Sequence, residues 1–147
     1  MTEFKFYHPL QMRYSDLDTQ WHVNNVKFVE FMEAARFAYI GAIGIWNGKS
    51  FLDLGLIVAS VHINYLKPIQ PNEQIRVGVR TSRLGNKSLD LEYVIEISTS
   101  HQVATTASSV MVTYDYPSQT TIPIPEKWRQ IISQYEGIPP ISVDHPK

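Results

Sequence analysis

Hydrophobic residues recur with helical spacing in one early segment and with a period of two in most of the chain that follows. Within residues 26–44, apolar side chains lie three and four positions apart and so share one helix face: Phe28, Phe31, Met32, Ala35 and Tyr39. Asn24 or Asn25 can cap this helix, and Lys27 with Glu30 and Glu33 with Arg36 are spaced as i,i+3 pairs. The pattern predicts one long helix whose apolar face must pack against a sheet.

The alternating segments predict strands and short turns. They cover residues 3–14, 54–68, 74–83, 87–98 and 101–116. Residues 84–86 supply a turn between two of them, so we expect an antiparallel meander. A short C-terminal helix is predicted at residues 126–135, directly after Pro125. The predicted fold class is therefore α+β, with a five-stranded antiparallel sheet wrapped around a long central helix.

Length and composition indicate one globular domain. The chain has 147 residues, of which 44% are hydrophobic and 18% charged, which is close to the globular average. Six of the nine prolines follow Tyr116, so we expect one domain over residues 1–137 and a loose tail over residues 138–147. The N-terminal segment lacks the apolar core of a signal peptide, which favours a cytoplasmic protein.

Several classes of chemistry are disfavoured by what the chain contains. It has no Cys, which excludes a disulfide framework and a Cys nucleophile. The five His residues are scattered, and there is no G-x-S-x-G elbow or Gly-rich phosphate loop, so we expect no metal and no cofactor. The net charge is −1, and the basic excess over residues 60–90 suits an anionic small molecule better than a nucleic acid.

The strands carry more apolar surface than one helix can cover. The residues concerned are Val61, Ile63, Tyr65, Val110, Val112 and Tyr114. We therefore expect a homodimer that pairs through its sheets or their edges, or a dimer of such dimers.

The segment from Asp16 to Asn25 concentrates polar chemistry just before the helix. Backbone N–H groups at a helix start, here near Asn25 and Val26, can stabilise an oxyanion on a carbonyl. Asp18 could attack the same carbonyl carbon or activate a water, with Gln20 and His22 as polar assistants. On residue chemistry alone, turn and cap roles for these Asp and Asn residues are the commoner outcome.

A resemblance to a known family favours the catalytic roles over the turn and cap roles. The run Arg13-Tyr14-Ser15-Asp16-Leu17-Asp18, followed by His22-Val23-Asn24-Asn25, resembles the signature of hotdog-fold acyl-CoA thioesterases of the 4-hydroxybenzoyl-CoA thioesterase type. INYLKPIQPNEQIRV and RLGNKSLDLEYVI resemble that family's second and third blocks, so the likeness covers residues from about 10 to 115. The first block is also similar to plant acyl-ACP thioesterases, with Gln20 in place of their Asn and Trp21 where many relatives carry Gly.

The resemblance implies roles for individual residues. Asp18 matches the catalytic carboxylate of the family, and the backbone amide of Asn25 matches an oxyanion donor. The family places its sites at a dimer interface lined partly by the partner's second strand, which makes Ser60, His62 and Asn64 candidate pocket residues. The CoA nucleotide is expected near the turn that carries four further candidates: Arg83, Asn86, Lys87 and Ser88.

Two alternatives stay open at this point. An acyl-ACP thioesterase would present its basic strand surface to an acidic carrier protein. A non-catalytic acyl-CoA-binding module would keep the basic turn and pocket without needing Asp18. Hotdog dehydratases and hydratases are disfavoured, because neither H-x-x-x-x-G nor D-x-N-P-x-H occurs in the chain.

Overall fold

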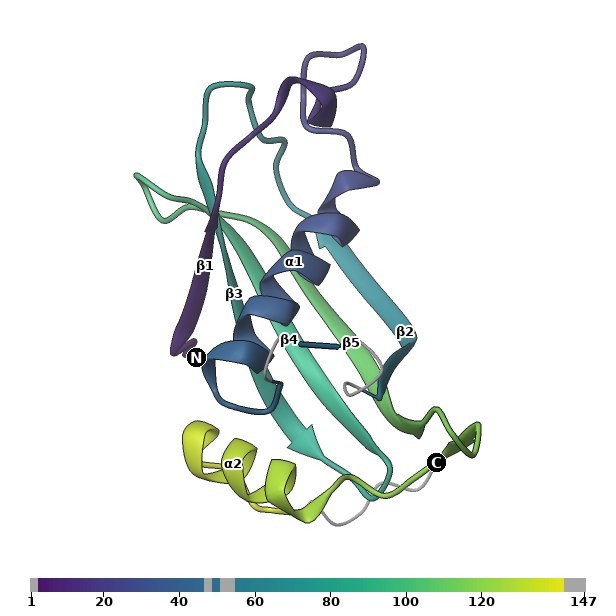
Figure 1. The fold of residues 1–147 in the computed structure, drawn as a ribbon. Coiled ribbons are helices and arrows are strands. Elements are labelled where there is room, and N and C mark those ends of the chain that lie inside the picture. Colours follow the sequence, from purple (N-terminus) through teal and green to yellow (C-terminus); the bar gives the residue numbers. More distant parts are fainter. Residues whose placement is uncertain (1–2, 47–48, 51–54, 142–147) are drawn as a thin grey trace. The chain divides into compact units, whose positions relative to one another are not determined.

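A computed structural model describes residues 3–46, 49–50 and 55–141 of the chain (Figure 1). Its strands are β1 (Phe6–Leu10), β2 (Leu56–Tyr65), β3 (Ile75–Leu84), β4 (Ser88–Ile97), β5 (Val103–Asp115) and β6 (Thr120–Thr121). Its helices are α1 (Lys27–Ala42), α2 (Glu126–Glu136) and a single 3-10 turn, η1 (Tyr14–Asp16). The predicted long helix, short C-terminal helix and five main strands are all present.

The strands form one sheet in the order β1-β3-β4-β5-β2, and the short β6 pairs with β5. β1 runs antiparallel to β3, with Phe6 opposite Val79 and Leu10 opposite Ile75. This arrangement confirms the predicted α+β class, with β6 as an addition that the sequence pattern did not indicate. β2 and β1 are the outer strands of the main order, and both have one side without a neighbouring strand in it.

The chain divides into two compact units, each described here by itself. The first contains residues 1–39, 63–79 and 93–107. Its core joins the apolar face of α1 to the sheet, and its fully buried members include Met32, Ala35, Tyr39, Val77 and Ile95. The rings of Phe6 and Tyr39 meet edge to face at 5.7 Å. The apolar side chains of α1 therefore pack against the sheet, as their spacing predicted.

One predicted pair on α1 is wrong. Arg36 is buried and donates from Nη1 to the Tyr93 hydroxyl at 3.1 Å, while Glu33 remains exposed. The register of α1 on the sheet, rather than spacing along the helix, decides the partner of Arg36. Lys27 and Glu30, spaced in the same way, do pair at 3.4 Å.

The second unit contains residues 40–62, 80–92 and 108–147. Its buried side chains include Leu84, Leu91, Met111 and Ile132 of α2. The Glu136 carboxylate accepts a hydrogen bond from the backbone N–H of Thr81 on β3 at 3.1 Å. α2 ends at Gly137, whose φ of 72° lies in the left-handed region that glycine tolerates. Residues 142–147 of the expected tail lie outside the described residues, and one domain over residues 1–137 stays a prediction.

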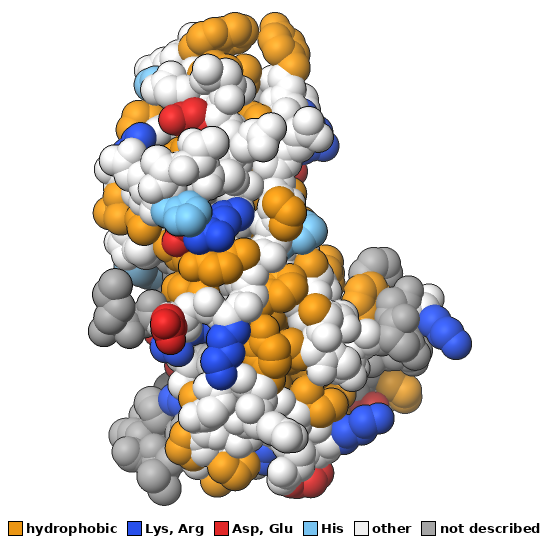
Figure 2. Space-filling model, turned by 90° about the vertical axis from the view of Figure 1, so that its left-hand side faces the viewer, with side chains coloured by type: hydrophobic (Ala, Val, Ile, Leu, Met, Phe, Trp, Pro, Cys, Tyr) orange, Lys and Arg blue, Asp and Glu red, His pale blue; other side chains and the backbone are white. Residues whose placement is uncertain are grey.

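Hydrophobic side chains also reach the surface. On the face drawn in Figure 2 they lie among charged side chains of both signs. Several large exposed ones belong to β2 and the residue after it: Ile57, Val58, Val61, Tyr65 and Leu66. None of the described helices is long and apolar enough to cross a bilayer.

Candidate active site

The loop between β1 and α1 is anchored by a buried carboxylate. Asp16 has no exposed side-chain surface and accepts hydrogen bonds from Arg13: Nη2 at 2.9 Å, Nε at 3.3 Å and the backbone N–H at 2.9 Å. Its backbone carbonyl accepts the Asn24 N–H at 2.8 Å. Asp16 therefore ties the start of the loop to its end, just before α1.

The environment of Asp16 favours its charged form. Burial acts to raise the pKa of this carboxyl, but the hydrogen bonds and charge of Arg13, with the charge of Lys27, outweigh burial and lower it. Lys27 Nζ lies 4.0 Å from Asp16 Oδ1. The first Asp of the D-x-D pair is thus a structural anion, held away from solvent.

Asp18 occupies a tight turn, and its two oxygens have different surroundings. The Asp18 N–H donates to the His22 carbonyl at 2.9 Å, and the Asp18 carbonyl accepts the Trp21 N–H at 3.0 Å. Oδ1 accepts the N–H groups of Gln20 at 2.9 Å and His22 at 3.3 Å. Among the described residues, Oδ2 accepts no hydrogen bond. One oxygen therefore fixes the carboxylate, and the other is available for chemistry.

The turn requires a left-handed residue at its tip. Trp21 has a φ of 64°, a conformation that favours glycine. The residue is 57% exposed, and its ring meets Tyr14 edge to face at 6.2 Å. This explains in backbone terms why Gly would fit the position.

The start of α1 presents one occupied and one free N–H. Asn24 Oδ1 accepts the Val26 N–H at 3.1 Å and so caps the helix. In the part of the chain that the structure describes, the Asn25 N–H donates to no protein acceptor. Of the two oxyanion candidates, Asn25 is therefore the available donor and Val26 is not.

Tyr65, at the end of β2, supports this helix start. Its hydroxyl donates to the Asn25 carbonyl at 3.1 Å, and its ring meets Phe28 edge to face at 5.1 Å. Figure 1 shows the end of β2 beside the first turn of α1. Sequence reasoning missed this contact because the two residues are far apart in the chain; the signal was the alternation that puts Tyr65 on one face with Val61 and Ile63.

These groups surround an open cavity of about 290 Å³ in the first unit. It is lined by Asp18, His22, Val23, Asn25, Phe28, Tyr65, Leu66, Lys67 and Pro68. Lys67 supplies a positive charge, and its Nζ donates to Gln102 Oε1 at 3.1 Å. The cavity thus combines a carboxylate, an imidazole and a free backbone N–H with an apolar wall suited to an acyl group.

The structure brings three of the four predicted catalytic residues to this cavity: Asp18, His22 and Asn25. Gln20 is exposed and contributes its backbone N–H to Asp18, while its side chain is not part of the lining.

The predicted substrate-binding residues lie elsewhere. Ser60, His62 and Asn64 are exposed on β2 and do not line the cavity, and Asn64 Nδ2 donates to Thr106 Oγ1 at 3.4 Å. Arg83 and Ser88 meet at the β3–β4 turn, where Arg83 also pairs with Asp90 at 3.1 Å.

Asn86 and Lys87 are exposed at the same turn. This turn belongs to the second unit. Three of the predicted catalytic residues thus line a cavity of the first unit, whereas the predicted nucleotide-binding residues belong to a surface turn of the second.

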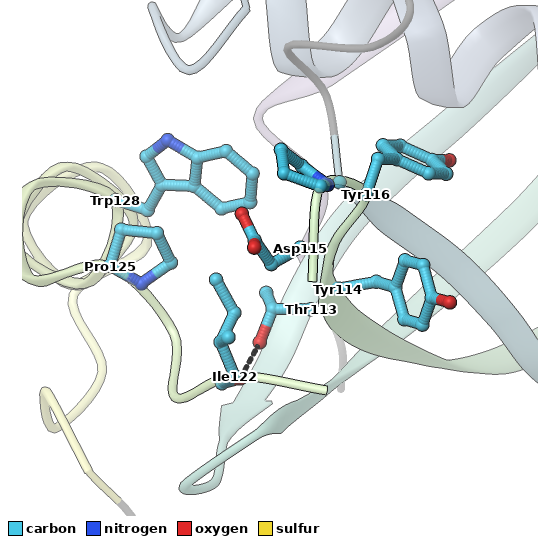
Figure 3. Close-up of a pocket in the computed structure, with 9 residues that line it drawn as sticks. Thr113, Tyr114, Asp115, Tyr116, Ile122, Pro125 and Trp128 are labelled. Atoms are coloured by element: carbon cyan, nitrogen blue, oxygen red, sulfur yellow. Dashed lines mark hydrogen bonds between the residues drawn. The ribbon is translucent and has the colours of Figure 1, made fainter. Parts of the chain in front are cut away.

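A second cavity of about 320 Å³ lies in the second unit, between the end of β5 and α2 (Figure 3). Its charged group is Asp115, whose carboxylate the picture shows pointing toward the Trp128 ring. Asp115 Oδ2 accepts the Ser118 N–H at 3.1 Å. No residue predicted from the sequence for catalysis or binding lines it.

Within residues 3–46, 49–50 and 55–141, no three His, Asp or Glu side chains gather in a group that could hold a metal ion.

Comparison with known proteins gives consistent likenesses. The family model described as "Thioesterase-like superfamily" matches residues 12–132, which include the whole loop from Asp16 to Asn25. The long-chain acyl-CoA thioesterase FadM of Escherichia coli (strain K12) is 27% identical over 130 residues, which cover 85% of this chain and 95% of FadM.

Two further relatives are 32% identical. For the uncharacterized protein YsmA of Bacillus subtilis (strain 168), the match extends over 95 residues and covers 65% of this chain and 63% of YsmA, just under two thirds of its length. A thioesterase from Thermus thermophilus, crystallised with coenzyme A and Zn, superposes with a TM-score of 0.81 and covers 95% of this chain and 100% of that one.

Proposed function

Because the chain belongs to the thioesterase-like superfamily, we propose that it hydrolyses an acyl-CoA thioester to a free acid and CoA, with Asp18 as the catalytic carboxylate. The family match and the relatives confirm the expected resemblance to hotdog thioesterases. At family level they also confirm the enzyme class, thioester hydrolase. The observation that carries the proposal is the asymmetry of Asp18, whose Oδ1 holds the turn while Oδ2 has no partner among the described residues.

The substrate carbonyl would lie at the start of α1. There its oxygen accepts the Asn25 N–H, which is free in the described chain, and the partial positive charge of the helix end favours the negative charge that develops during attack. The acyl chain extends along the apolar part of the lining, which includes Val23, Phe28 and Leu66.

Asp18 can act in two ways that give the same products. As a nucleophile, Oδ2 attacks the thioester carbon, the C–S bond breaks, the thiolate leaves and takes a proton, and water then hydrolyses the mixed anhydride. As a general base, Oδ2 takes a proton from a water that attacks the thioester carbon directly; the C–S bond of the resulting tetrahedral intermediate then breaks, and the leaving thiolate takes the proton from Asp18. In both routes His22 acts as a polar assistant and Gln20 supports Asp18 through its backbone N–H, and one water is consumed per acid and thiol released.

The substrate pocket is proposed to be completed by a second copy of the chain. β2 lies at the end of the sheet order and exposes Ile57, Val58 and Val61, so two copies could pair there. Ser60, His62 and Asn64 are exposed on the same strand and would then be available to the partner's substrate. Sedimentation at micromolar concentration should give a dimer or a larger even assembly, and a monomer would contradict this arrangement.

The nucleotide of CoA is assigned to the β3–β4 turn. Asn86, Ser88 and Arg83 provide hydrogen-bond donors for phosphate groups, and the exposed Lys87 provides positive charge. An acidic acyl carrier protein is the alternative partner that could bind the same positively charged turn. Free CoA should inhibit turnover of acyl-CoA, whereas stronger inhibition by free carrier protein would favour the carrier.

The decisive experiment measures thiol release from short, medium, long and aromatic acyl-CoAs. The chain has no Cys and contributes no thiol background. Asp18→Asn should lower kcat by about 100-fold or more, and it should fold normally because an amide oxygen can still accept the Gln20 and His22 N–H groups.

Asp115→Asn is the matched control, because it is the same change at a carboxylate that also accepts a backbone N–H. Near wild-type turnover by Asp18→Asn would remove the catalytic assignment. If no acyl-CoA is hydrolysed but acyl-CoA still binds, the protein is a binding module.

A further inference from the structure

Arg129, in α2, is a buried cation attached to the β3–β4 turn. Only 8% of the residue is exposed. Its Nη1 donates to the Gly85 carbonyl at 2.9 Å and its Nη2 donates to the Asn86 carbonyl at 3.2 Å. A third bond, from Nη1 to the Pro140 carbonyl at 2.8 Å, binds the segment that follows α2. The guanidinium therefore joins the turn to the C-terminal part of the chain.

The charge of Arg129 is not neutralised by a carboxylate among the described residues. The hydrogen-bond partners of its side chain are all backbone carbonyls. Arg83, in contrast, has its charge balanced by Asp90 at 3.1 Å. The turn thus retains the positive charges of Arg129 beneath it and of Lys87 on its surface, and a buried charge acts strongly over short distances.

Two further contacts hold the carbonyls of the same turn. The Ile124 N–H donates to the Asn86 carbonyl at 2.9 Å. The Thr113 N–H donates to the Lys87 carbonyl at 3.0 Å. The Thr113 hydroxyl lies 2.5 Å from the Ile122 carbonyl oxygen and 3.1 Å from that of Lys87, and its one proton is shared between them. Figure 3 shows Thr113, Ile122 and Pro125 together at the place where the chain leaves β5 for α2. Three consecutive carbonyls, of residues 85, 86 and 87, are therefore held by hydrogen bonds.

Fixing a carbonyl also fixes the N–H of the next residue. In a trans peptide the C=O and N–H groups point in opposite directions. The N–H groups of Asn86 and Lys87 therefore point away from Arg129, and neither donates to a protein acceptor in the described chain. Consecutive N–H groups with a common direction form a site suited to an anion.

From these contacts we propose that Arg129 is a positioning residue for phosphate binding by the substrate's nucleotide. It holds the β3–β4 turn so that the Asn86 and Lys87 N–H groups and the Lys87 ammonium face a phosphate together. The inference rests on the proposed function, because it assigns the turn to the phosphorylated end of a CoA thioester. It gives α2, which lines no part of the Asp18 cavity, a role in substrate affinity.

The kinetic test compares two substrates with the same acyl group: an acyl-CoA, and an acyl-pantetheine that lacks the nucleotide. Arg129→Lys and Arg129→Gln should raise KM for the acyl-CoA by about 5- to 10-fold with little change in kcat. KM for acyl-pantetheine should not change. Lys127→Gln, an exposed position on the same helix, is the matched control and should leave both KM values unaltered.

An equal rise in both KM values, or equal wild-type KM values for the two substrates, would overturn the inference and leave the thioesterase proposal standing. A second measurement does not depend on catalysis or on folding of the variants. In the wild-type protein, adenosine 3′,5′-bisphosphate should slow hydrogen exchange of the Asn86 and Lys87 amides. Unchanged exchange overturns the inference whatever the turnover, whereas slowed exchange without any turnover would contradict only the thioesterase proposal.

Discussion

Asp16 and Asp18 are two residues apart, yet their carboxylates have opposite environments. Asp16 is fully buried, and both of its oxygens accept hydrogen bonds from Arg13. Asp18 holds a turn with Oδ1 and has no partner for Oδ2 among the described residues. The D-x-D pair therefore divides into a structural carboxylate and a chemically available one.

Asp16→Asn should reduce stability much more than activity. The amide cannot accept from Arg13 with both of its polar atoms, so we expect a loss of about 1–2 kcal/mol in the free energy of unfolding at pH 7. kcat should fall far less than in Asp18→Asn. Chemical denaturation and thiol release measure the two effects, and a loss of activity as large as that of Asp18→Asn would contradict the division of roles.

The same carboxylate predicts how stability depends on pH. The pKa of Asp16 is lowered in the folded state, so its contribution is present above the unfolded-state value of about 3.9 and disappears as pH falls through the folded-state value. The difference in unfolding free energy between wild type and Asp16→Asn should therefore shrink below about pH 4. A difference that stays constant down to pH 2 would contradict the lowered pKa.

Tyr65→Phe tests the support of the helix start. The variant keeps the ring against Phe28 and removes the hydroxyl that donates to the Asn25 carbonyl. We expect kcat to fall by about 3- to 10-fold, as for the loss of one neutral hydrogen bond, with an unchanged melting temperature. Tyr114→Phe, on a ring that meets Tyr116 in the second unit, is the control, and equal kcat values for both variants would rule out the role.

Trp21 allows a test of backbone strain. Because its φ is 64°, Trp21→Gly should be more stable than Trp21→Ala by about 1 kcal/mol. Both variants lose the contact with Tyr14, so the difference between their stabilities reports the backbone strain at position 21 alone. At Thr19, which is exposed in the same loop, Ala should equal or exceed Gly. Thermal unfolding of the four variants checks this, and the same order at both positions would show that residue 21 carries no strain.

Local patterns predicted the elements because each one depends on neighbours in sequence. The spacing of Phe28, Met32 and Ala35 placed the buried face of α1, and the alternation from Leu89 to Ile97 placed β4. The density of polar residues before α1 located Asp18 and His22, both of which line the cavity. These features need no knowledge of the tertiary structure.

Other features depend on contacts between distant segments and could not be predicted. Helical spacing suggested that Arg36 pairs with Glu33. In the structure α1 packs on the sheet so that Arg36 donates a hydrogen bond to the Tyr93 hydroxyl instead. Residue type could not tell the Asn25 N–H from the Val26 N–H, because the orientation of the Asn24 side chain decides which one is free. The sequence pattern of residues 126–135 does not single out Arg129, whose contact with the Gly85 carbonyl joins segments 44 residues apart.

The helix cap by Asn24 has a consequence for recognising distant relatives. The group that this site offers at position 25 is a main-chain N–H, which every residue except proline possesses. Selection for activity would therefore preserve the conformation at position 25 more strictly than its side chain. Sequence searches that score amino-acid identity will undervalue this position. A structural search for an uncapped backbone N–H seven residues after a carboxylate would detect the same site in divergent sequences.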